Sequence, residues 1–335
     1  MRASRFRAIL AQMTDLSVQF CGVTFKNPLV LASGILGITA SSWSNVVKNG
    51  AGGITTKSLW LKEHKGHKNP VIIANDHYML NAVGLPDGGV EKAREEISKF
   101  LEVRGALPGA DKKHPIPLIA NIVAFSIADF AKTAEEIALS NPDIIEVNIS
   151  CPNVEDEFGK PFACVAGDAA AVTKAVKKAL KELGGTAAKI PISIKLSPNV
   201  DNIVEIARAV VDAGADALTV INSVGPGMAI NLETRMPILS NRAGGLTGPP
   251  LKPLAVKFIH DIRRAFPKIP IIGTGGVCTG EDALEMMIAG ATLVGVGTGV
   301  YYRGVEVFGL ITKEMDAWCV ANKVKKVSDL IGTVK

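Results

Sequence analysis

The chain of 335 residues is 47% hydrophobic but only 5% aromatic, and it contains 33 glycines. This length accommodates one α/β barrel, because such barrels commonly use about 250 residues plus insertions. The net charge of +5 is spread along the chain without a block of like charge, which favours a small anionic ligand and gives no support for nucleic-acid binding.

The first segment, 1–15, is basic and only briefly apolar. Its apolar run is too short for a signal peptide, so we expect an N-terminal extension over 1–15 and a single domain over 16–335. No apolar run along the chain approaches the roughly 20 residues of a membrane span, so we expect no membrane association.

Short apolar runs alternate with amphipathic segments along the rest of the chain, and Gly-Ala pairs such as Gly214-Ala215 separate helix from strand. Eight runs are predicted as strands: Pro28–Ala32, Gly53–Thr56, Pro117–Ile122, Ile144–Val147, Pro191–Ile194, Ala217–Ile221, Ile269–Ile272 and Thr292–Val296. Predicted helices lie between most of them: Ser42–Lys48, Glu91–Val103, Phe130–Leu139, Ala169–Leu183, Ile203–Ala213, Leu251–Phe266 and Glu281–Ile288. This alternation predicts a (β/α)8 TIM barrel. A doubly wound sheet is the main competitor, but no Gly-x-Gly-x-x-Gly follows the first strand.

Two connections are too long for simple turns. One runs over 59–89 after the second strand, and the other runs over 224–250 after the sixth. Long segments without regular structure in a compact domain are usually lids or binding loops, which is what we expect of both.

Polar residues and glycines follow the predicted strands where ordinary turn residues would suffice. They are Ser33-Gly34, Lys57-Ser58, Asn121, Asn148, Lys195, Asn222-Ser223, Gly275-Gly276 and Gly297-Thr298. Lysine and asparagine are costly to bury unless paired, so their convergence on one barrel mouth predicts a ligand site. The amides suit a planar heterocycle with imide-like edges, and the glycine pairs suit a phosphate, which needs close approach to backbone N–H groups.

Cysteine usage points to one reactive thiol. The five cysteines are Cys21, Cys151, Cys164, Cys278 and Cys319, and no two have C-x-x-C spacing. We therefore expect no metal or iron–sulfur site on this chain and a reducing, cytoplasmic environment. Cys151 lies in the polar stretch 146–153, where lysine charge would lower its pKa and make it a base or nucleophile. Cys164 is the competing candidate, although a packing role is commoner for such a residue.

The sequence resembles the dihydroorotate dehydrogenase family, most closely its class 1 members, from about residue 16 to the C-terminus. The motifs that carry the resemblance are 27–34 (NPLVLASG), 56–58 (TKS), 79–86 (MLNAVGLP), 148–153 (NISCPN), 194–198 (IKLSP), 244–249 (GGLTGP) and 272–277 (IGTGGV). The resemblance implies a barrel that holds FMN at its mouth and oxidises (S)-dihydroorotate to orotate in pyrimidine (UMP) biosynthesis.

The resemblance also implies a role for individual positions. Cys151 is implied as the base that removes the C5 proton while hydride leaves C6 for the flavin. The implied FMN contacts are Ala32, Ser33, Lys57, Ser58, Asn121, Asn148, Lys195, Ile221 and Gly248, with Gly275, Gly276, Gly297 and Thr298 at the phosphate. The implied substrate contacts are Lys57, Asn81, Ala82, Val83, Gly84, Leu85, Asn148, Asn153, Asn222 and Ser223.

The sequences of motifs 79–86 and 244–249 resemble those of class 1B, the NAD-linked form. In that class a separate electron-transfer subunit carries FAD and a 2Fe-2S cluster, so the resemblance implies such a partner around a homodimer core, in a heterotetramer. Class 1A, which passes electrons to fumarate, stays open. Class 2, linked to membrane quinone, is disfavoured because it has serine where Cys151 stands.

The loop over 154–167 departs from the family pattern by its length. Its Ala163-Cys164 and Gly167-Asp168 resemble dihydropyrimidine dehydrogenases, which act on uracil and thymine, so a flavoenzyme of that type stays open as an alternative. A non-catalytic flavin-binding subunit is the alternative from another class.

Overall fold

The computed structural model describes residues 14–111, 113–149 and 161–335. Its centre is a closed barrel in which every neighbouring pair of strands is parallel. The eight strands are β3 (Leu29–Leu31), β4 (Gly53–Thr55), β7 (Leu118–Ile122), β8 (Ile144–Asn148), β9 (Ile192–Lys195), β10 (Ala217–Val220), β15 (Ile271–Thr274) and β16 (Leu293–Val296). The predicted TIM barrel and its eight strands are confirmed.

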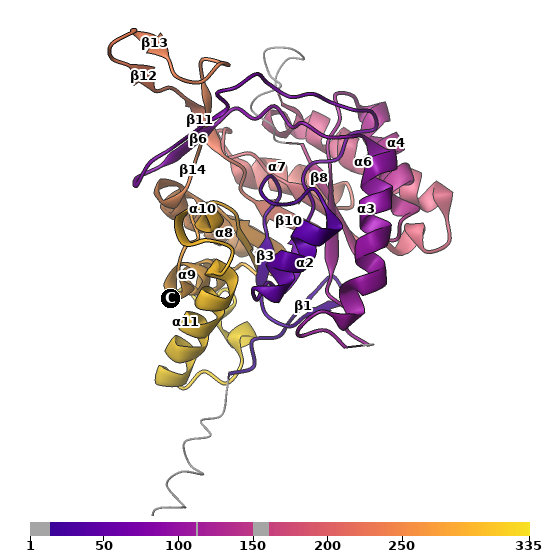
Figure 1. Cartoon of the computed structure of the whole chain (residues 1–335). Coiled ribbons are helices and arrows are strands. Elements are labelled where there is room, and N and C mark those ends of the chain that lie inside the picture. Colours follow the sequence, from indigo (N-terminus) through magenta and orange to yellow (C-terminus); the bar gives the residue numbers. More distant parts are fainter. Residues whose placement is uncertain (1–13, 112, 150–160) are drawn as a thin grey trace, which may run out of the picture.

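Helices cover the outside of the barrel (Figure 1). They are α2 (Ala40–Lys48), α3 (Val90–Val103), α4 (Ile127–Ala138), α6 (Ala166–Leu183), α7 (Ile203–Asp212), α8 (Lys252–Ala265), α9 (Gly280–Ala289), α10 (Gly299–Arg303) and α11 (Val307–Ala321). Side-chain caps fix several helix starts, as at Ser126, Asn202 and Thr279, which satisfy backbone N–H groups of the first turn. The strands are buried on both faces, because the helices cover their outer face and their inner face points into the barrel interior.

The two long connections form a second sheet, so the prediction that both are segments without regular structure was wrong. Strands β5 (Ile72–Ala74) and β6 (Met79–Asn81) come from the first connection, and β11 (Val224–Gly227) and β14 (Gly244–Thr247) come from the second. Strand β6 pairs antiparallel with β14 over 79–81 and 245–247. Each strand is short, and the pairing joins residues more than 160 positions apart, which explains why no local pattern reveals it.

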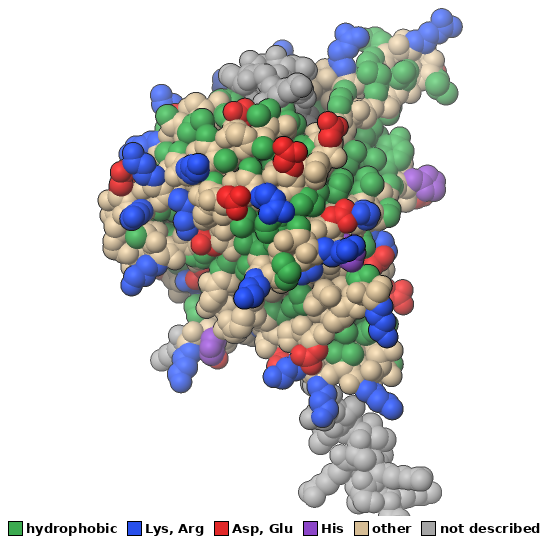
Figure 2. Space-filling model, turned by 180° about the vertical axis from the view of Figure 1, so that it is seen from behind, with side chains coloured by type: hydrophobic (Ala, Val, Ile, Leu, Met, Phe, Trp, Pro, Cys, Tyr) green, Lys and Arg blue, Asp and Glu red, His purple; other side chains and the backbone are tan. Residues whose placement is uncertain are grey.

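A hairpin, β12 (Ile230–Asn231) and β13 (Met236–Pro237), projects from this sheet at the upper left of Figure 1. Its exposed apolar side chains include Leu232, which is 87% exposed, and apolar atoms gather there at the upper right of Figure 2. Elsewhere on the face that Figure 2 shows, basic and acidic side chains are interspersed.

The opposite end of the barrel is covered by the antiparallel pair β1 (Val18–Phe20) and β2 (Val23–Phe25) (Figure 1). Phe20 and Phe25 from this pair are fully buried and meet edge to face. Of the predicted extension over 1–15, residues 1–13 lie outside the described residues, while the backbone N–H of Thr14 donates to Asp316 on α11. In the described part of the chain, no helix has the length and apolarity to span a bilayer.

Candidate functional site

The described residues of the predicted site lie at one end of the barrel, because the carboxyl ends of parallel strands share one rim. Asn121, Asn148 and Lys195 belong to the ends of β7, β8 and β9. The next residues after β3, β4, β10, β15 and β16 supply the others: Ala32, Ser33, Lys57, Ser58, Ile221, Asn222, Ser223, Gly275, Gly276, Gly297 and Thr298. Cys151 and Asn153 follow β8 but lie outside the described residues.

One side of this mouth is a buried polar cluster from β4, β7, β8 and β9. Asn148 pairs in register with Lys195, and its Nδ2 donates to Ser58 Oγ at 3.3 Å. The Asn121 backbone N–H donates to Thr56 Oγ1 at 3.0 Å, and its side-chain amide Nδ2 donates to Glu146 Oε1 at 2.5 Å. These contacts fix the amides in place before any ligand arrives.

Two buried oxygen atoms in this region have no hydrogen-bond partner within the described ranges, namely Ser33 Oγ and Asn121 Oδ1. Trp43 Nε1 on α2 and Thr133 Oγ1 on α4 share this property away from the mouth. A buried polar group without a partner costs about 1–3 kcal/mol. Asn121 Oδ1 and Ser33 Oγ therefore suit a ligand that donates hydrogen bonds.

The two lysines at the mouth supply positive charge in a poorly hydrated place. Lys195 is only 7% exposed, and within the described part of the chain its ammonium makes no ion pair or side-chain hydrogen bond. Burial lowers the pKa of Lys57, and the nearby Asp87 carboxylate opposes this effect. Buried ammonium groups are costly unless paired, which favours an electron-rich or anionic ligand here.

The ends of β15 and β16 form a glycine-lined cradle. Gly275 and Gly276 have φ values of 132° and 79°, and a Cβ at Gly276 would come within 2.7 Å of the Gly248 carbonyl oxygen. Gly297 lies beside Ala32, and the short helix α10 begins directly after Thr298. Loops after the last two barrel strands, together with a short extra helix, are the usual phosphate site of this fold. The cradle therefore fits a phosphate group.

The predicted substrate segment, 81–85, begins at the last residue of β6 and is held by hydrogen bonds at both of its ends. Asn81 Nδ2 donates to the Gly245 carbonyl at 3.4 Å, while Trp60 Nε1 donates to the Leu85 carbonyl at 2.8 Å. Gly84 and Leu85 adopt positive φ values of 73° and 53°. The sequence analysis missed Trp60, which lies in a connection where no periodic pattern marks a buried ring.

Glu146 is the other residue that the sequence analysis did not single out. It is 2% exposed and stands in the apolar run Ile144–Val147, where a carboxylate is out of place in a strand buried on both faces. That incongruity was the available signal. The alternative base, Cys164, donates its thiol to the Asn199 carbonyl at 3.6 Å.

Comparison with known proteins gives one consistent picture. A family model described as dihydroorotate dehydrogenase matches residues 15–318. The catalytic subunit of dihydroorotate dehydrogenase B (NAD(+)) from Methanocaldococcus jannaschii is 44% identical over 300 residues, which covers 90% of this chain and 92% of the relative. The corresponding subunit from Methanothermobacter thermautotrophicus is 39% identical over 317 residues, or 95% and 97% of the two chains. That from Geobacter sulfurreducens is 39% identical over 326 residues, or 97% and 99%.

Proposed function

The chain belongs to the dihydroorotate dehydrogenase family, and from this membership we propose that it oxidises (S)-dihydroorotate to orotate as the catalytic subunit of an NAD-linked, class 1B enzyme of pyrimidine biosynthesis. The observation that carries the proposal is the barrel mouth. It combines half-buried and buried lysines, two buried oxygen acceptors in need of donors and a glycine cradle. These groups together suit a flavin phosphate and a planar pyrimidine acid.

We infer that the cofactor is FMN. Gly275, Gly276, Gly297 and Thr298 would take its phosphate, because a phosphate binds backbone N–H groups and can approach them most closely at glycines such as Gly275 and Gly276, whose φ values are positive. The polar shell around its ring would come from Ser33, Lys57, Ser58, Asn121, Asn148 and Lys195, with Ala32, Ile221 and Gly248 as close neighbours. A bound flavin supplies the acceptor for the hydride that leaves C6 of the substrate.

The protein's own share of the reaction is orientation and proton transfer. We propose that Cys151 takes the C5 proton, and that the segment after Asn148 brings its thiol to the substrate. Lys57 would pair with the substrate carboxylate, and the amide groups would hold the pyrimidine edges. The proposed substrate contacts are Asn81, Ala82, Val83, Gly84, Leu85, Asn148, Asn153, Asn222 and Ser223.

We propose that electrons leave through a second subunit that carries FAD and a 2Fe-2S cluster, bound to a homodimer of this chain in the cytoplasm. The relatives are named as catalytic subunits of an NAD-linked enzyme, which supports a partner. The five cysteines of this chain lack cluster spacing, so such centres would need another chain.

The proposal is tested with purified protein reconstituted with FMN. Under anaerobic conditions, dihydroorotate should bleach the flavin absorbance, whereas dihydrouracil at the same concentration should leave it oxidised. Faster bleaching by dihydrouracil would move the enzyme to the dihydropyrimidine dehydrogenase type. Protein that stays colourless after incubation with FMN would exclude a flavoenzyme altogether.

A further inference from the structure

A buried carboxylate lies in the barrel interior next to the proposed cofactor site, and among the described residues it forms a hydrogen bond with one group assigned to that site, the Asn121 amide. Glu146 on β8 accepts hydrogen bonds from Asn121 Nδ2 on β7 at 2.5 Å and from Thr219 Oγ1 on β10 at 2.6 Å. Strands β8 and β10 are separated by β9 in the barrel. The contact between Glu146 and Thr219 therefore runs through the interior.

The interior position of Glu146 is one layer below the mouth. Side chains two residues apart on a strand share a face, so Glu146 lies on the same face of β8 as Asn148. On β9, Ser193 and Lys195 share a face in the same way, and Ser193 Oγ lies 3.0 Å from Thr219 Oγ1. Asn148 and Lys195 are paired in register, as are Glu146 and Ser193. The lower layer thus supports the layer that carries the proposed FMN contacts.

The chemistry of Glu146 decides how the Asn121 amide is turned. Both carboxylate oxygens of Glu146 accept hydrogen bonds, one from Asn121 and one from Thr219, so the Asn121 amide directs its NH2 group toward Glu146. The Asn121 carbonyl oxygen is then left over, buried and without a partner among the described residues. Without Glu146 the amide could turn over and offer a donor in place of an acceptor.

We infer that Glu146 is a positioning residue that fixes Asn121 as a hydrogen-bond acceptor for the imide N–H of the flavin ring. This inference rests on the proposed function, since it assigns the ligand of the Asn121 carbonyl to the cofactor. Glu146 touches neither cofactor nor substrate in this role. It acts through Asn121 alone, while Thr219 donates to its second oxygen and Ser193 in turn contacts the Thr219 hydroxyl.

A double-mutant cycle on flavin affinity tests this role. In E146Q the glutamine has one acceptor in place of two, so the orientation of the Asn121 amide is no longer imposed. The affinity of the apoprotein for FMN, measured by the quenching of flavin fluorescence, should fall about 10-fold, as expected for one lost buried hydrogen bond. Because the effect passes through Asn121, E146Q should weaken FMN binding less than about 2-fold in an N121A background.

Thr219 provides the matched control. The substitution Thr219→Val removes the other donor to Glu146 and leaves the Asn121 contact in place. It should lower the melting temperature of the apoprotein at least as much as E146Q, yet change FMN affinity less than about 3-fold. A purely structural role would give T219V and E146Q the same effect on affinity.

A flavin analogue probes the proposed hydrogen bond directly. N3-methyl-FMN lacks the imide N–H, so wild-type protein should bind it more weakly than FMN, and N121A should bind the two equally. If E146Q does not fold, Glu146→Asp replaces it, because the shorter side chain keeps the charge but loses its reach to Asn121.

The outcomes separate this inference from the proposed function. A wild-type protein that binds FMN and is bleached by dihydroorotate, while E146Q binds FMN as tightly, overturns the role of Glu146 alone. Equal losses from E146Q in the wild-type and N121A backgrounds also overturn it. A wild-type protein that binds no FMN overturns both.

Discussion

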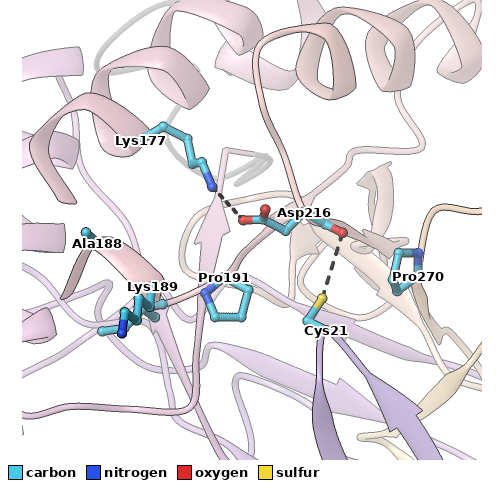
Figure 3. Close-up of a pocket in the computed structure, with 8 residues that line it drawn as sticks. Cys21, Lys177, Ala188, Lys189, Pro191, Asp216 and Pro270 are labelled. Atoms are coloured by element: carbon cyan, nitrogen blue, oxygen red, sulfur yellow. Dashed lines mark hydrogen bonds and ion pairs between the residues drawn. The ribbon is translucent and has the colours of Figure 1, made fainter. Parts of the chain in front are cut away.

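The two ends of the barrel differ in whether their polar side chains have partners within the protein. At the amino-terminal end, Asp216 precedes β10 and its Oδ2 accepts from Lys177 Nζ at 2.8 Å (Figure 3). The same oxygen accepts from the Ile192 backbone N–H, also at 2.8 Å. Asp143 precedes β8 and repeats this arrangement, accepting from the Leu118 backbone N–H at 2.8 Å and pairing with Arg104. Each aspartate ties its own strand to the start of the neighbouring strand.

At the mouth, by contrast, polar groups are left over. Lys195 lacks a counterion within the described part of the chain, and Ser33 Oγ and Asn121 Oδ1 lack hydrogen-bond donors there. The difference separates residues that stabilise the barrel from residues that await a ligand, in keeping with the usual division of labour in this fold.

The hollow at the amino-terminal end illustrates the distinction. Its lining includes Cys21, Lys177, Lys189 and Asp216 (Figure 3), a set that resembles a reactive site by composition. Burial raises the pKa of the Cys21 thiol to about 12, and the Asp216 carboxylate adds to the effect. Since the thiolate is the reactive form, Cys21 is inert at neutral pH, and Lys177 is already paired.

The largest expected effect is the loss of the proposed base at the mouth. Replacing Cys151 with alanine should slow flavin reduction by dihydroorotate by about 10² to 10⁴-fold, the usual contribution of a general base. The melting temperature should stay nearly unchanged. Anaerobic stopped-flow absorbance measures the rate. The control Cys164→Ala should alter this rate less than about 3-fold. If Cys164→Ala slowed the reaction more than Cys151→Ala did, Cys164 would be the base.

The second prediction compares two lysines from the two ends. Lys195→Ala should weaken FMN binding about 10- to 100-fold, because it removes a charged hydrogen-bond donor from the proposed site. It should leave the melting temperature of the apoprotein equal or higher, since a buried ammonium without a counterion is lost. Lys177→Ala, at the other end, should lower the melting temperature, because it breaks the ion pair with Asp216, and should leave FMN affinity unchanged. If both variants lower stability and leave FMN affinity intact, the contrast between the two ends fails.

The third prediction concerns the amino-terminal end alone. Asp216→Ala leaves the Ile192 N–H without its acceptor and Lys177 without its partner, so it should lower the free energy of unfolding by about 2 kcal/mol. Urea unfolding of the apoprotein measures this change. FMN affinity and the rate of flavin reduction should remain at wild-type values. A large loss of affinity would show that the two ends are coupled.

The sequence predicted the barrel strands, their helices and the polar residues at the strand ends better than it predicted contacts between segments far apart in the chain. Eight strands and their helices could be predicted because apolar runs, amphipathic segments and Gly-Ala pairs are local signals. The polar residues at the strand ends were also visible locally. The sheet of β5, β6, β11 and β14 was not, because Asn81 pairs with Gly245 far along the chain. The hydrogen bond between Glu146 and Thr219 was not visible either, because it joins strands that are not neighbours and only the closed barrel brings these side chains together.

The smallest expected effect is the pH dependence of stability at Lys57. Burial lowers the pKa of Lys57 from 10.5, so the folded protein disfavours the charged form relative to the unfolded chain. This penalty is fully present below the lowered pKa and disappears as the pH rises through it toward 10.5.

Lys57→Met removes the penalty, so the stability of the wild type relative to this variant should increase with pH over that window, by less than the Asp216→Ala effect. Lys178→Met, at an exposed lysine on α6, is the control for the loss of a lysine side chain. A flat difference between wild type and Lys57→Met would mean that the mouth places no strain on this lysine, and the contrast between the two ends would then rest on Lys195 alone.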